Sequence, residues 1–117
     1  MSPNPIPIRF YQTENGSEPV REWLKDLGRP ASTIVGAGIR KVQSKWPVGL
    51  PLCRPMGDGV HEVRRTLHDD RIARILFSFH DGEMILLHGF IKKTEKTPDA
   101  DLRLARERKA RYEAAQG

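Results

Sequence analysis

The stretch RIARILFSFHDGEMILLHGF, residues 71–90, contains two apolar runs separated by a short polar segment. The first run, Arg71 to Phe79, is almost entirely apolar, which is typical of a strand in the middle of a sheet. His-Asp-Gly-Glu, residues 80–83, predicts a tight hairpin turn, and Met84 to Phe90 predicts the strand after it. We therefore expect an antiparallel pair of strands at the centre of the fold.

A third strand is predicted immediately upstream. Residues 60–68 alternate, which places His61, Val63, Arg65 and Leu67 on one face and Glu62, Arg64 and Thr66 on the other. The preceding segment PVGLPLCRPMGDG, residues 47–59, holds three prolines and three glycines and predicts a long loop.

The amino-terminal part predicts a strand and two helices. Residues 7–13 have the β-branched and aromatic content of a strand, and the prolines before them suit a sheet edge. Ser17 is a candidate cap for a first helix that ends at Gly28. A second helix is expected after Pro30, capped by Ser32 or Thr33, with Pro47 ending it.

The carboxy-terminal part predicts a third helix, with Thr97 as its cap, Pro98 at its first position and Asp99 in its first turn. Leu102, Ala105 and Tyr112 fall on one stripe of this helix. The whole order predicts an α+β fold: a small, mostly antiparallel sheet with two N-terminal helices and a C-terminal helix. We expect residues 1–117 to form one domain, with the helices against one face of the sheet and the other face available for a ligand.

Charge and composition narrow the class of protein. The chain has 20 Lys and Arg against 15 Asp and Glu, a formal net charge of +5 at pH 7 and a pI near 9.7. This balance favours an acidic partner such as nucleic acid slightly over an ordinary basic protein without one. The single Cys53 fits a reducing compartment. The segment MSPNPIPIRF lacks the pattern of a secretory signal and no apolar run could cross a bilayer, so we expect a cytoplasmic protein without membrane contact.

Metal and cofactor chemistry have no support in the motifs. The four histidines, at positions 61, 68, 80 and 88, lack the close spacing of a zinc site. There is no Walker loop and no dinucleotide-binding fingerprint. We expect neither a metal nor a cofactor.

The remaining candidates are basic residues near strand ends and edges: Arg64, Arg74, Lys92, Lys93 and Lys96. Arg74, within an apolar strand, must either point to the open face or be buried with an acid such as Glu62. Taken singly, each cation is explained as a surface charge, an ion-pair partner or a lysine that discourages edge pairing. Together they indicate a phosphate-binding face.

Three segments carry a resemblance to a known group: LPLCRPMGDGVHEVR (residues 50–64), RILF (74–77) and LLHGFIKKTEKTPDADLRLARERKARY (86–112). They resemble the phage-derived, HigB-like branch of the RelE/ParE toxin superfamily. The resemblance extends over nearly the whole chain, from Phe10 to Tyr112. Where that family often has Gly-Leu-Trp-Glu, this chain has Gly-Val-His-Glu at residues 59–62.

The resemblance implies a toxin of a type II toxin–antitoxin system that cleaves mRNA, typically on the ribosome, without a metal. The ribose 2′-OH attacks the neighbouring phosphate, and basic side chains stabilise the charge and transfer protons. Arg64 would hold the scissile phosphate, and Arg74 would assist it or position the backbone. Lys92 and Lys93 would supply electrostatic stabilisation and proton transfer.

Four further residues receive roles less directly. His88 is either an acid or base or a packed histidine. Lys96, Arg65 and Tyr112 are candidate RNA contacts, although the position of Tyr112 on the helical stripe favours packing. The implied partners are mRNA, the ribosome and a helix-turn-helix antitoxin that covers the basic face.

Three other interpretations remain open at this point. A ParE-like protein would share the fold and inhibit DNA gyrase without a nuclease step. A degenerate phage remnant would bind RNA or its repressor and cleave nothing. A small basic protein without a nucleic-acid partner would explain the composition alone.

Overall fold

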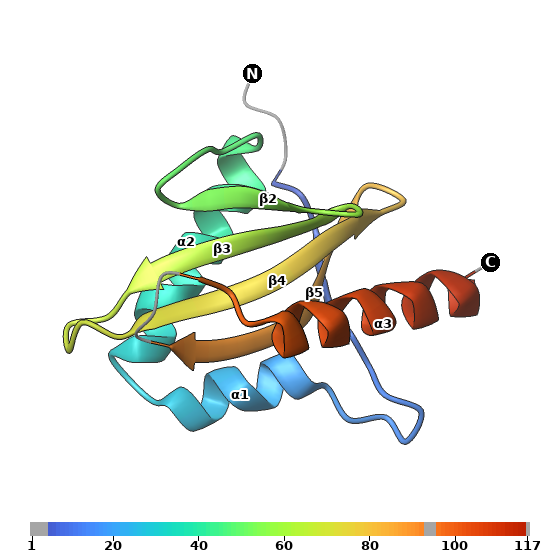
Figure 1. Ribbon diagram of the computed structural model, residues 1–117, viewed down its shortest axis with the longest axis horizontal. Helices are drawn as coiled ribbons and strands as arrows, with labels where there is room; N and C mark the ends of the chain where they lie inside the picture. Colours follow the sequence, from blue (N-terminus) through green and yellow to red (C-terminus); the bar gives the residue numbers. More distant parts are fainter. Residues whose placement is uncertain (1–4, 93–95, 117) are drawn as a thin grey trace.

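The fold is built on a five-stranded sheet in a computed structural model that describes residues 5–92 and 96–116 (Figure 1). The strands are β1 (Ile8–Phe10), β2 (Cys53–Gly57), β3 (Val60–Thr66), β4 (Ile72–His80) and β5 (Glu83–Lys92), in the spatial order β1-β5-β4-β3-β2. β1 runs parallel to β5, and the other neighbours are antiparallel. The predicted α+β class is confirmed.

The three helices are α1 (Pro19–Leu27), α2 (Ala31–Lys45) and α3 (Asp99–Gln116). In Figure 1, α3 crosses in front of the strands and α2 lies behind them. Val35 of α2 packs with Phe77 on one side of the sheet. Ala105 of α3 packs with Leu76 and Leu87 on the other side. The expectation that all helices share one face was wrong, because the apolar stripe of α3 is buried against the second face.

The residues predicted to cap the N-terminal ends of the first two helices do not do so, whereas Gly28 is the C-cap of α1 as predicted. α1 begins after Glu18, and the Ser17 hydroxyl instead lies 2.7 Å from that of Thr13. α2 follows Pro30 directly, so Ser32 and Thr33 lie within the helix. The stop at the second helix was predicted correctly, because α2 ends two residues before Pro47.

The start of α3 also differs from the prediction, in which Thr97 was the cap. The Pro98 carbonyl accepts the amides of Asp101 and Leu102, at 3.1 and 3.2 Å, so Pro98 takes the capping position. The side chain of Thr97 is left for another contact. Thr97 is buried, and its hydroxyl contacts Glu62 of β3.

The segment predicted as a loop, residues 47–59, contains the strand β2. Cys53 pairs with Val63 and Arg54 pairs with Glu62. Pro55 suggested a loop because it cannot donate a ladder hydrogen bond, but β2 is at the edge of the sheet, where one side of a strand needs no partner. This strand places the Arg54 side chain on the face of the sheet that α3 covers.

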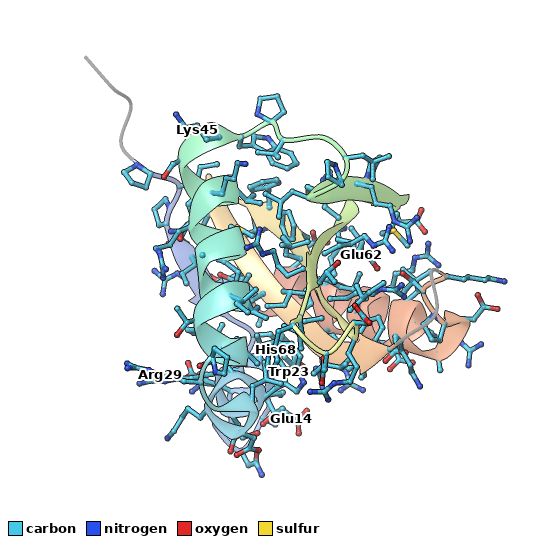
Figure 2. The ribbon with its side chains drawn as sticks, turned by 90° about the vertical axis from the view of Figure 1, so that its left-hand side faces the viewer. Glu14, Trp23, Arg29, Lys45, Glu62 and His68 are labelled. Atoms are coloured by element: carbon cyan, nitrogen blue, oxygen red, sulfur yellow. The ribbon has the colours of Figure 1, made fainter. Side chains whose placement is uncertain are left out.

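Close approach of α1 to the sheet depends on one glycine. A Cβ atom at Gly89 of β5 would stand 2.5 Å from the ring of Trp23, so only a hydrogen fits there. Figure 2 shows α2 lying along the sheet, with Trp23 near its lower end. None of the helices among the described residues has the length and hydropathy required to span a bilayer.

Candidate functional site

Cross-strand register brings two rows of side chains together on the α3 side of the sheet. One row joins Arg54, Glu62, Leu76 and His88, from β2, β3, β4 and β5. The next row joins Arg64, Arg74 and Phe90. Paired residues on neighbouring strands have Cα atoms about 5 Å apart, so cations far apart in sequence become neighbours.

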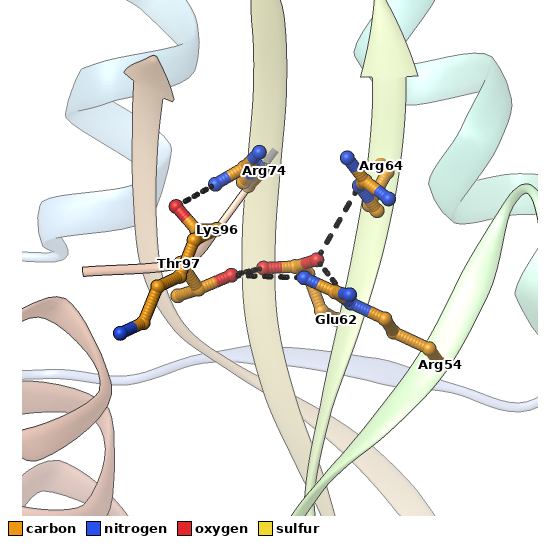
Figure 3. Close-up of polar contacts among 6 residues, drawn as sticks. All are labelled: Arg54, Glu62, Arg64, Arg74, Lys96 and Thr97. Atoms are coloured by element: carbon orange, nitrogen blue, oxygen red, sulfur yellow. Dashed lines mark hydrogen bonds and ion pairs between the residues drawn. The ribbon is translucent and has the colours of Figure 1, made fainter. Parts of the chain in front are cut away.

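Glu62 is at the centre of the polar contacts on this side. Its side chain is 0% exposed, and its Oε1 atom lies 3.1 Å from Arg54 Nε and 3.6 Å from Arg64 Nε. The Thr97 hydroxyl donates to Oε2, and Arg54 Nη2 donates to the same hydroxyl oxygen at 3.4 Å. Figure 3 shows these contacts, which join β2, β3 and the segment before α3. A buried carboxylate requires such partners, because an uncompensated charge away from water is costly.

Arg74 is buried with 0% of its surface exposed. Its Nη1 atom donates to the Lys96 carbonyl at 2.9 Å, and its guanidinium lies 5.9 Å from the centre of the Phe90 ring. Of the two predicted placements, burial is the one observed. Arg74 therefore anchors the segment before α3, and its burial does not support the predicted direct part in catalysis.

Positive charge reaches solvent above these buried groups. The Arg64 side chain is 15% exposed and that of Arg54 is 29% exposed. Lys92 and Lys96 are exposed. Lys92 follows Phe90 by two residues on β5, so alternation places it on the same face. We call the residues drawn in Figure 3 the Glu62 cluster: Arg54, Glu62, Arg64, Arg74, Lys96 and Thr97.

Residues 22–110 match the family model described as Phage derived protein Gp49-like (DUF891). The chain belongs to the Gp49-like family. The matched span includes strands β2 to β5 and the whole Glu62 cluster. No curated protein matches the chain.

His88 of the Gp49-like protein connects β5 to α3. Its Nε2 atom lies 2.6 Å from Asp101 Oδ1, and its ring stacks on Phe90 with centroids 5.3 Å apart. The predicted alternatives were an acid or base and a packed histidine. These contacts describe a packed residue that holds α3 on the sheet.

Two predicted RNA contacts lie away from the Glu62 cluster. Arg65 points to the α2 side, where its Cδ atom would stand 2.7 Å from a Cβ added at Gly38, so it does not join the Glu62 cluster and its contact with RNA stays a prediction. Tyr112 lies near the far end of α3, with its ring 5.5 Å from that of His80. Packing, the favoured alternative for Tyr112, is what the structure shows. Lys93 lies outside the described residues.

Sequence reasoning missed Arg54 and Thr97 as site residues, and it named Glu62 only as a possible partner of a buried Arg74. Alternation along residues 53–57 would have placed Arg54 beside Glu62 if the proline-containing run had been interpreted as an edge strand. No local signal indicated Thr97, because its contact with Glu62 joins residues 35 positions apart.

His61 occupies the position where the HigB-like pattern often has tryptophan. Its ring lies 5.0 Å from Trp46 and 5.4 Å from Phe77, on the α2 side of the sheet. Burial lowers the pKa of His61, which keeps the ring neutral near pH 7. Trp46 thus supplies an aromatic ring to this part of the core.

Within residues 5–92 and 96–116, no three potential ligand side chains are grouped as a metal site requires.

Cys53 should resist alkylation in the folded protein. Burial, with a smaller effect from the Glu62 charge, raises the pKa of the Cys53 thiol to about 11. At pH 8 roughly one thiol in a thousand would be ionised, and the thiolate is the reactive form. We expect iodoacetamide to label the protein only in urea, as measured by mass spectrometry. Labelling of the folded protein at the rate of a free thiol would contradict this placement.

Proposed function

We propose that this Gp49-like protein is the toxin of a type II toxin–antitoxin system and cleaves mRNA. The observation that supports this most is the gathering of Arg54, Arg64, Lys92 and Lys96 on one side of the sheet. Four cations on one surface suit a phosphodiester backbone. The resemblance to the HigB-like branch of the RelE/ParE superfamily supplies the reaction.

In the proposed reaction the ribose 2′-OH loses its proton to solvent water and attacks the adjacent phosphorus. The 5′ oxygen of the next nucleotide leaves, and a 2′,3′-cyclic phosphate remains. The intermediate carries extra negative charge on its equatorial oxygens. Arg64 would bind these oxygens, because its planar guanidinium matches them and stays charged. The buried Glu62 carboxylate orients the Arg64 guanidinium through its contact with Nε.

Lys92 would donate the proton that the departing 5′ oxygen requires. The residue is exposed at the end of β5, two positions beyond Phe90, which neighbours Arg74 in the next strand. An ammonium group is a donor in its ordinary charged form, so this role needs only a position within hydrogen-bonding reach of the leaving oxygen.

A second basic surface supports the ribosome as a partner. No Asp or Glu occurs between Leu27 and Gly57, and Arg40, Lys41 and Lys45 of α2 are exposed. Figure 2 shows Lys45 at the end of α2, on the opposite side of the sheet from Glu62. We assign this surface to phosphates of ribosomal RNA. A helix-turn-helix antitoxin would cover the α3 side.

Mapping of mRNA 5′ ends after brief induction tests the proposed function. We expect growth arrest with new 5′ ends inside translated regions, and we expect both effects to disappear when the antitoxin is co-expressed. Arrest with intact mRNA would contradict the nuclease. In that case a DNA supercoiling assay would test the ParE-like alternative, inhibition of gyrase.

A further inference from the structure

A pocket of about 520 Å³ opens beside the Glu62 cluster, between β2 and the start of α3. Arg54, Met56, Lys96, Asp99 and Leu102 are among the residues that line it. We infer that this pocket holds a nucleotide adjacent to the cleaved bond and that Asp99 selects guanine there. This inference rests on the proposed function in taking RNA as the ligand.

The apolar part of the pocket suits the face of a base. Met56 from β2 and Leu102 from α3 are partly buried and pack on the α3-side core, so their positions are fixed. Pro55 adds a further apolar surface. Bases stack on apolar and aromatic side chains in single-stranded RNA sites, whereas the backbone remains in contact with cations.

The cationic part of the pocket is held by buried groups. Arg54 Nε lies 3.1 Å from Glu62 Oε1, and Arg54 Nη2 donates to the buried Thr97 hydroxyl. The backbone of Lys96 is fixed by its carbonyl, which accepts from the buried Arg74. A phosphate between Arg54 and Lys96 would therefore meet one oriented guanidinium and one ammonium on an anchored backbone.

The acidic part of the pocket gives it a preference among bases. Asp99 is exposed in the first turn of α3. Its carboxylate only accepts hydrogen bonds, so it favours a base edge with adjacent donors. Guanine presents two donors side by side, N1–H and the N2 amino group, and can bind both carboxylate oxygens. Adenine, cytosine and uracil each present only one donor group on the corresponding Watson–Crick edge. The Asp99 carboxylate also repels phosphate groups. This repulsion directs the RNA backbone toward Arg54 and Lys96.

The pocket can be tested with four 2′-O-methyl heptamers, UUUXUUU, in which X is each of the four bases. Fluorescence anisotropy measures their affinity, and the 2′-O-methyl group prevents cleavage. We expect the wild-type protein to bind the X = G strand about tenfold more tightly than the others. Asp99→Asn should remove this preference, because an amide offers one acceptor and one donor group. Lys96→Ala should weaken all four strands alike and reduce their salt dependence.

Glu107→Gln is the matched control, since Glu107 is an exposed carboxylate further along α3. It should keep the guanine preference. Equal affinity of the wild-type protein for the four strands, or an unchanged preference in Asp99→Asn, would overturn the pocket assignment. Guanine preference without mRNA cleavage in cells would overturn only the nuclease, and cleavage without base preference would overturn only the pocket. Failure to bind any strand would overturn the pocket assignment, whereas the mapping of mRNA 5′ ends decides the nuclease separately.

Discussion

Replacing Arg64 with alanine should abolish the growth arrest that we propose for the wild-type protein and lower RNA cleavage by roughly 100- to 1,000-fold. The reason is that Arg64 is partly exposed on the α3 side while its Nε atom is held 3.6 Å from Glu62. Its guanidinium is thus oriented before RNA binds, and removing it takes away charge stabilisation that develops in the transition state. Growth after induction and cleavage of ribosome-bound mRNA measure the two effects.

Arg21→Ala is the control for loss of one arginine. Arg21 lies on α1, its side chain is 64% exposed and it pairs with Glu18, the residue immediately before that helix. This variant should remain toxic. Arg64→Lys, which keeps the charge but loses the planar fork, should retain part of the activity. An Arg64→Ala protein that unfolds at the wild-type temperature and is equally toxic would remove Arg64 from the mechanism.

Replacing Glu62 with alanine should lower the free energy of unfolding by about 3–5 kcal/mol. The side chain is fully buried and contacts Arg54, Arg64 and Thr97, from β2, β3 and the segment before α3. Without the carboxylate, partly buried guanidinium groups lose their counter-charge. Urea denaturation followed by circular dichroism gives the change in free energy.

Glu83→Ala provides the comparison at the surface. Glu83 pairs with Arg9 at 2.8 Å, but these side chains are 25% and 61% exposed. Solvent screening limits such a pair, so this variant should lose no more than about 1 kcal/mol. Equal losses in the two variants would mean that the buried carboxylate does not hold the strands and the start of α3 together.

Alternation in residues 60–66 predicted correctly that Glu62 and Arg64 share one face and that Arg65 lies on the other. This worked because a half-buried strand imposes a period of two on its side chains. The sequence did not indicate which face α3 covers, because an apolar stripe shows that a helix is buried but not against what. Strand β2 was missed because Pro55 has the same local signature in a loop and in an edge strand.

The parallel pairing of β1 with β5 has a consequence for synthesis of the protein. Residues 8–10 can pair only after residues 84–86 have been synthesised. Glu62 can contact Thr97 only after residue 97 has been added. Such long-range pairing slows folding, since distant segments must lose conformational entropy before their contact stabilises the chain. A nascent chain therefore cannot complete its sheet or its cationic surface until the residues through Thr97 have left the ribosome.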